Sequence, residues 1–163
     1  MSKLYQSTPL ACPYNRARDL LAETLEPLAK SGQPWVLNLR APLVGEGLDL
    51  AKEVVVTVGT ATDPLHFDQI WSIHWHPVEG GAYPDFQGTI TIRADQTYKT
   101  SLLELQGEYE PPFGAVGAAF DAVLGARVAS ATARELLRSF GSKIESAYFE
   151  TEHAKKEQRE AIG

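Results

Sequence analysis

The chain has 163 residues, of which 44% are hydrophobic and 22% are charged. This length and this balance are typical of one globular domain with a sizeable buried core. The formal net charge of −6 disfavours non-specific binding to nucleic acid or to an anionic membrane surface. We therefore expect one folded domain over residues 1–150, no nucleic-acid partner, and a charged, frayed tail over 151–163.

Cysteine content and hydropathy bear on the compartment. The single cysteine, Cys12, excludes a disulfide within the chain, so the sequence gives no support for an oxidising compartment. The first ten residues lack an apolar run of signal-peptide length, and no stretch approaches about 20 consecutive apolar residues. We expect a cytoplasmic protein without integral membrane contact, in which Cys12 is a structural thiol.

The first part of the chain predicts a short strand, a helix and a second strand. Leucines recur at helical spacing over Arg16–Lys30, with Asn15 as the expected N-cap and Ser31-Gly32 as the stop. Pro27 lies inside this pattern, so we expect it to kink the helix or to split it in two. The apolar run Trp35–Leu39 then has the character of a strand.

Four strand patterns follow between residues 53 and 109, joined by short turns. They cover residues 53–60, 66–76, 86–93 and 99–109. In the second of them, aromatic and aliphatic side chains alternate with mostly polar ones, as expected for a strand with one buried face. Short turns between such strands predict an antiparallel meander, whose apolar face needs a cover.

The expected cover is a long helix that begins after Pro111-Pro112-Phe113-Gly114 and ends near Tyr148. Small and apolar residues recur along it at spacings of three and four, which makes one continuous stripe. A helix of this length must lie across the sheet, gripped by the curvature of the sheet. Alanine and serine in its first half predict either very close packing or a gap beneath the helix. The stripe is Ala119, Val123, Ala126, Ser130, Ala133, Leu137, Phe140, Ile144 and Tyr148, and Thr132 falls on the opposite face.

The segment Leu105–Gly117 (LQGEYEPPFGAVG), continuing to Asp121 and Arg127, resembles the last strand and last helix of bacterial helix-grip proteins. That superfamily includes START-type domains, proteins similar to the birch-pollen allergen, and the polyketide cyclase/dehydrase group. The resemblance implies an α+β fold, in which a curved antiparallel sheet wraps around a long C-terminal helix and a short helical segment follows the first strand. It also implies a small apolar or amphipathic ligand, lipid- or polyketide-like, between sheet and helix. It implies no cofactor, and no catalytic residue can be carried over.

The candidate cavity combines the apolar face of the sheet with the small-residue stripe of the helix. An aromatic wall suits a flat or hydrophobic ligand, although large aromatic residues are equally common in filled cores. Arginines bordering the stripe suit an anionic ligand end, or are simply solvated. Tyr83, Tyr98 and Tyr109 are further hydrogen-bond donors. The candidate lining is Trp71, Ile73, Trp75, Phe86, Ile90, Leu103, Tyr109, Ala126, Ser130, Ala133 and Leu137, with Arg127 and Arg134 as the polar mouth.

His66, His74 and His76 share the polar face of one predicted strand, where a His-x-His pair places two imidazoles about 7 Å apart. Together with Asp68 or Glu79 they would suit zinc. Because this whole face is polar, we expect it to be solvated and to hold no metal.

Three classes of function stay open on the sequence alone. The first is ligand binding in the cavity, and the second is a cyclase- or dehydratase-type enzyme that uses the same cavity. The third is a protein-interaction module with a filled core, which would act through its surface as a homodimer.

Overall fold

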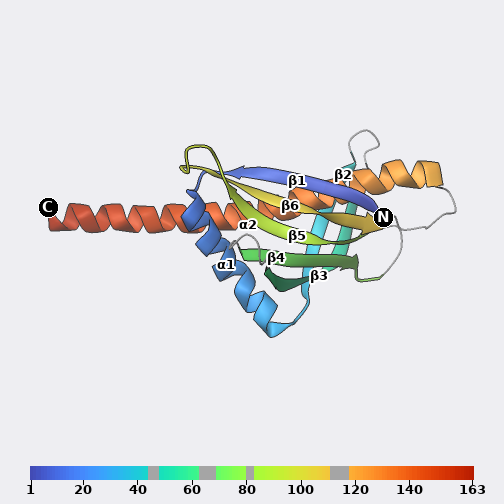
Figure 1. The fold of residues 1–163 in the computed structure, drawn as a ribbon, viewed down its shortest axis with the longest axis horizontal. Helices are drawn as coiled ribbons and strands as arrows, with labels where there is room; N and C mark the ends of the chain where they lie inside the picture. Colours follow the sequence, from blue (N-terminus) through green and yellow to red (C-terminus); the bar gives the residue numbers. More distant parts are fainter. Residues whose placement is uncertain (44–47, 63–68, 80–82, 111–117) are drawn as a thin grey trace.

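The computed structural model describes residues 1–43, 48–62, 69–79, 83–110 and 118–163 (Figure 1). These residues form β1 (Ser2–Leu10), α1 (Tyr14–Ser31), β2 (Trp35–Leu43), β3 (Leu48–Thr62), β4 (Gln69–Pro77), β5 (Asp85–Ala94), β6 (Ser101–Glu110) and α2 (Ala118–Ile162). The strands make one antiparallel sheet in the order β1-β6-β5-β4-β3-β2. The predicted meander is therefore confirmed as β3 to β6, and β1 and β2 extend it at its two edges.

The alternation predicted for β4 is confirmed by the burial of its side chains. The odd-numbered residues from 71 to 75 are at most 2% exposed, whereas the even-numbered residues from 70 to 76 are partly exposed. Alternate side chains of a strand point to opposite faces, so one face of the sheet is buried and the other is partly exposed to solvent. The face that carries Trp71 is called the inner face below, and the other the outer face. His66 and Asp68 lie outside the described residues.

Helix α2 lies along the inner face and contacts both edge strands, β1 and β2. A helix that reaches both edges of one sheet requires the sheet to curve around it. Figure 1 shows α2 behind the strands, with both of its ends reaching past them. In its middle, Phe140 and Ile144 are 0% and 1% exposed. The predicted arrangement, a curved sheet around a long helix, is confirmed.

Helix α1 departs from the sequence prediction at its start and at its proline. Pro13, not Asn15, is the N-cap, and no side chain caps the helix. The Ala17 amide donates to the Pro13 carbonyl at 2.9 Å, so the fixed φ of proline leads the chain into the first turn. The helix also continues through Pro27 to the predicted stop at Ser31-Gly32, so of the two alternatives, a kink or a split, the split is wrong. Contacts with β3, β5 and α2 hold the helix in one piece.

Two residues of α2 lie in environments opposite to those predicted. Val123, expected on the buried stripe, is 56% exposed because the first turns of α2 reach past the sheet (Figure 1). Thr132, expected on the polar face, is 0% exposed. The buried surface in the middle of α2 is wider than one stripe, and Tyr83 covers it at Thr132. Val128, Ala129 and Leu136 are buried there too.

The predicted helix end near Tyr148 is wrong, because α2 continues to Ile162. Residues 152–163, expected to belong to a frayed tail, are exposed but helical to 162. Side-chain pairs one turn apart favour this extension: Lys155–Glu152 at 3.0 Å and His153–Glu157 at 3.4 Å. Within the described ranges, neither helix is apolar enough over a sufficient length to span a membrane.

Candidate functional site

The inner face of the sheet carries an apolar wall built from β4, β5 and β6. Every sheet residue predicted to line a cavity is buried, with at most 5% of its surface exposed. The predicted burial is therefore confirmed, whereas contact with a ligand stays a prediction. The wall consists of Trp71, Ile73, Trp75, Phe86, Ile90, Leu103 and Tyr109.

Phe86 lies against the sheet because two glycines beside it have no side chains. Gly88 and Gly107 are direct register partners on β5 and β6. A Cβ atom on Gly88 would lie 2.6 Å from Phe86 Cζ, and one on Gly107 would lie 2.7 Å from it. On its other side, the Phe86 ring stacks on the indole of Trp75, with ring centroids 4.0 Å apart and planes 17° apart. The glycine pair and the indole thus hold the phenyl ring in one orientation.

Trp75 adds an unpaired hydrogen-bond donor to this wall. Its side chain is 0% exposed, and its indole Nε1–H is buried without a partner among the described residues. Leaving a buried donor unpaired costs about 1–3 kcal/mol. An acceptor atom at this point of the wall would therefore be bound in preference to an apolar one.

Tyr83 and Thr132 form a second polar feature inside the core. Tyr83, just before β5, is 3% exposed, and its hydroxyl is hydrogen-bonded to Thr132 Oγ1 of α2. Thr132 donates its own proton to the Val128 carbonyl at 2.8 Å, so Tyr83 is the donor in the shared bond. Burial raises the pKa of Tyr83 to about 12, although the bond to Thr132 opposes this. At neutral pH Tyr83 is therefore a hydroxyl donor and not a base.

The three tyrosines considered as donors differ in position. Tyr83 and Tyr109 are buried, at 3% and 5% exposure, while Tyr98 is 67% exposed in the turn before β6. Sequence reasoning missed Thr132 as a partner, since the helical period placed it on the polar side. A hydroxyl residue in a run of alanines (Val128–Ala133) is the one signal that pointed to it.

The residues that α2 was predicted to supply are only partly brought together. Ala133 and Leu137 are buried in the core, and Ala126 and Ser130 are partly exposed. The candidate mouth residues, Arg127 and Arg134, are exposed. Their contact with an anionic ligand end therefore stays a prediction.

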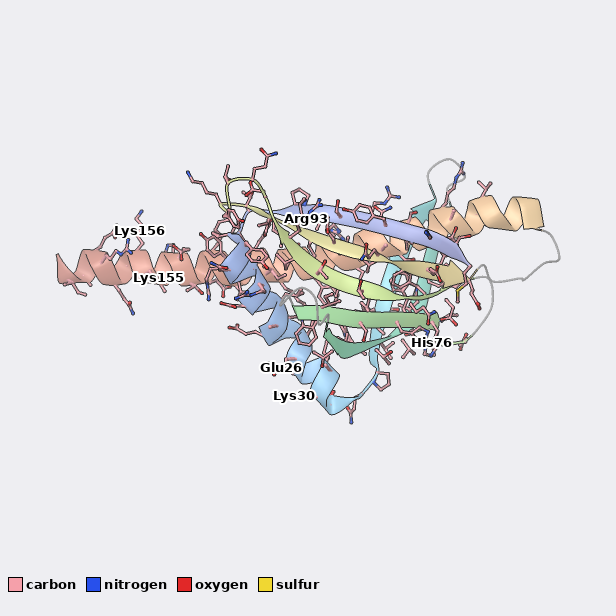
Figure 2. All side chains as sticks on the ribbon, viewed as in Figure 1. Glu26, Lys30, His76, Arg93, Lys155 and Lys156 are labelled. Atoms are coloured by element: carbon pink, nitrogen blue, oxygen red, sulfur yellow. The ribbon has the colours of Figure 1, made fainter. Side chains whose placement is uncertain are left out.

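On the outer face, His74 and His76 lie beside an acid from the next strand. His74 Nε2 is 3.4 Å from Asp85 Oδ1 of β5, and the two imidazole centroids are 5.4 Å apart. Figure 2 marks His76 near the end of β4. One ligand atom from each of these three residues lies within 4.8 Å of the other two. His66, Asp68 and their surroundings are not described, and Asp85 was not among the sequence candidates.

No protein-family model and no curated protein matches the chain. Among solved structures, TTHA0849 from Thermus thermophilus matches 90% of this chain and 99% of its own, at 14% identity and a TM-score of 0.50. A START superfamily protein from Mycobacterium smegmatis matches over 89% and 98%, at 11% identity and a TM-score of 0.49. Ara h 8.0201 matches over 91% and 98%, at 9% identity and a TM-score of 0.46. At such identities a likeness shows the fold alone.

The strand order, the curved sheet and the gripped C-terminal helix, together with the Thermus likeness, decide the architecture. The chain has the helix-grip fold. The expected α+β class and the short helical segment after the first strand are thus confirmed.

Cys12 of this helix-grip chain has the properties of a structural thiol. It is 0% exposed, between β1 and α1, and its sulfur contacts the Pro13 carbonyl at 3.7 Å. Burial raises the pKa of Cys12 to about 11, with Arg16 lowering it slightly and Glu145 raising it. The thiol stays protonated at neutral pH, and nucleophilic chemistry requires the thiolate.

Proposed function

We propose that this helix-grip protein binds a small apolar or amphipathic ligand, lipid- or polyketide-like, between the inner face of the sheet and α2. The observation that carries the proposal is the unpaired indole N–H of Trp75, buried in a mostly apolar wall. Ligand sites typically combine such an apolar lining with a few placed polar groups that orient the ligand. The ligand is therefore expected to carry a hydrogen-bond acceptor, such as a carbonyl oxygen.

The polar groups of the described core favour binding over catalysis. Besides the tyrosines, Cys12 and the indoles, the buried polar side chains in the described ranges are Ser101 and Thr132. Ser101 donates to the Cys12 carbonyl at 2.8 Å, and Thr132 donates to Val128, so both are already engaged. Proton transfer needs a group with a pKa near the working pH, and Tyr83 at about 12 does not supply one.

The proposal is tested with two ligands of nearly the same shape, 2-acetylnaphthalene and 2-ethylnaphthalene. Only the first carries a carbonyl acceptor. Isothermal titration or tryptophan quenching should show saturable binding of both at about one per chain. Because one net hydrogen bond contributes about 1 kcal/mol, the ketone should bind about fivefold more tightly than the hydrocarbon.

Two matched variants separate the hydrogen bond from loss of indole bulk. Trp75→Phe removes the N–H and should abolish the preference for the ketone. Trp71→Phe, on the same inner face of β4 and 1% exposed, should weaken both ligands while keeping the preference. If the wild-type protein binds neither ligand saturably, or if Trp75→Phe keeps the preference, the proposal is wrong.

A further inference from the structure

We infer that His74, His76 and Asp85 bind a divalent transition-metal ion such as Zn²⁺ on the outer face of the sheet. This site is separate from the ligand site proposed above, because β4 lies between them with Trp75 on the inner face. One ligand atom of each residue lies within 4.8 Å of the others. Zinc bonds of about 2.0–2.2 Å would draw these atoms somewhat closer, which half-exposed side chains can do by rotating about their χ angles.

The strand geometry holds the three side chains together without help from a loop. His74 and His76 are two residues apart on β4, so their side chains leave the same face. Trp75 pairs with Phe86 and His74 pairs with Gln87, which brings Asp85 alongside this end of β4. The distance of 3.4 Å between His74 Nε2 and Asp85 Oδ1 shows that the carboxylate already lies against one imidazole.

One atom of the cluster is not accounted for by hydrogen bonds. His76 Nδ1 is buried and has no partner in the described part of the chain. A buried ring nitrogen without a partner loses its interaction with water and gains nothing in exchange. If the outer face were only a solvated surface, this nitrogen would be expected to reach water or a neighbouring side chain.

The surroundings of the cluster favour a cation. His74 and Asp85 line a hollow of about 150 Å³ whose wall also includes Glu108 and Glu110 of β6. Glu110 on β6 is the register partner of Asp85, and Glu108 is the register partner of Gln87, which itself pairs with His74. Two glutamates of β6 thus lie across β5 from the cluster. Two imidazoles and one carboxylate suit zinc, iron, cobalt or nickel better than magnesium or calcium, which prefer oxygen ligands. Three protein ligands leave a coordination position open to water or a small molecule.

The experiment uses the full chain without an affinity tag, stripped with EDTA and returned to chelator-free buffer. Titration with ZnCl₂ by calorimetry should show one ion per chain, and Zn²⁺ should raise the melting temperature. CoCl₂ gives a second readout, since its visible absorption reports the coordination of the bound ion. His74→Gln, His76→Gln and Asp85→Asn should each weaken binding at least about tenfold.

His153→Gln is the matched control, because His153 is an exposed histidine on α2 that pairs with Glu157. Figure 2 shows the nearby Lys155 and Lys156 toward the opposite end of the molecule from His76. The His153→Gln variant should bind Zn²⁺ as the wild type does. In EDTA, the double variant of His74 and His76 to Gln should melt like the wild type, and added Zn²⁺ should no longer raise its melting temperature. Absence of saturable binding to the wild type, or unchanged affinity in Asp85→Asn and in the histidine variants, overturns the inference.

Discussion

The hydroxyl of Tyr83 donates a buried hydrogen bond to Thr132 Oγ1, and so joins the segment before β5 to the middle of α2. The two residues are 49 positions apart in the sequence. The Thr132 hydroxyl in turn donates a hydrogen bond to the Val128 carbonyl within the helix. This short chain of donors ties the sheet to the helix through a polar contact in an apolar core.

Replacing Tyr83 by Phe should lower the free energy of unfolding by about 1 kcal/mol, measured by urea denaturation. The loss is modest because the Thr132 hydroxyl keeps its hydrogen bond to the Val128 carbonyl, so the substitution leaves no buried donor unpaired. Tyr98→Phe is the control, since Tyr98 is 67% exposed, and it should leave stability unchanged. Equal effects of the two substitutions would mean that the buried bond contributes nothing.

Alkaline pH should destabilise the wild type more than the Tyr83→Phe variant. The unfolded chain releases the Tyr83 proton near pH 10, whereas the folded chain holds it to about 12. The folded state therefore binds more protons in this range, and its stability falls as pH rises from about 10 to about 12. The difference between these values corresponds to at most about 2.7 kcal/mol. Stability curves of the two proteins that stay parallel over this range would contradict the prediction. Cys12, whose pKa is also raised, is present in both proteins and cancels in the comparison.

Gly107→Ala should destabilise the protein by about 1–3 kcal/mol, by overpacking the contact between β5 and β6. The new Cβ would lie 2.5 Å from Gly88 Cα and 2.7 Å from Phe86 Cζ, where backbone and a stacked ring cannot easily yield. Gly59→Ala is the matched control, because among the described residues its Cβ would meet only Ser72 Oγ, at 2.7 Å, and that hydroxyl can rotate away. Equal chemical denaturation midpoints for Gly107→Ala and Gly59→Ala would contradict the prediction, because β5 and β6 would then accommodate the added methyl group without loss of stability.

Ala133→Trp should either block uptake of the naphthalene ligands or lower stability by about 1–3 kcal/mol. Ala133 is 0% exposed at the centre of α2, so added bulk must enter the ligand space or the packed interface. Arg134→Trp, on the exposed side of the same turn, should change neither property. Unchanged binding and melting temperature in Ala133→Trp would mean that this position does not face the sheet.

Much of the fold could be predicted because its signals are local. Alternation in β4 needs only the two-residue period of a strand, so the burial of Trp71 and the exposure of His74 followed from the sequence. The stripe of α2 needs only the helical period, which placed Ala133, Leu137 and Phe140 correctly. The stop of α1 at Ser31-Gly32 was predicted correctly, because glycine is a local signal. The predicted end of α2 was wrong, because it depends on weaker effects such as the side-chain pairs that favour its extension to Ile162.

The sequence by itself determined which elements form and which face of each is apolar, since these properties depend on neighbours along the chain. Only the tertiary structure decided which faces meet. The burial of Thr132 depends on cover from Tyr83, which belongs to another segment, and the helical period of α2 does not predict that contact. Likewise, Asp85 joins His74 only through the register of β4 against β5. Both candidate sites are therefore products of contacts between segments, which packing of the whole sheet around α2 selects.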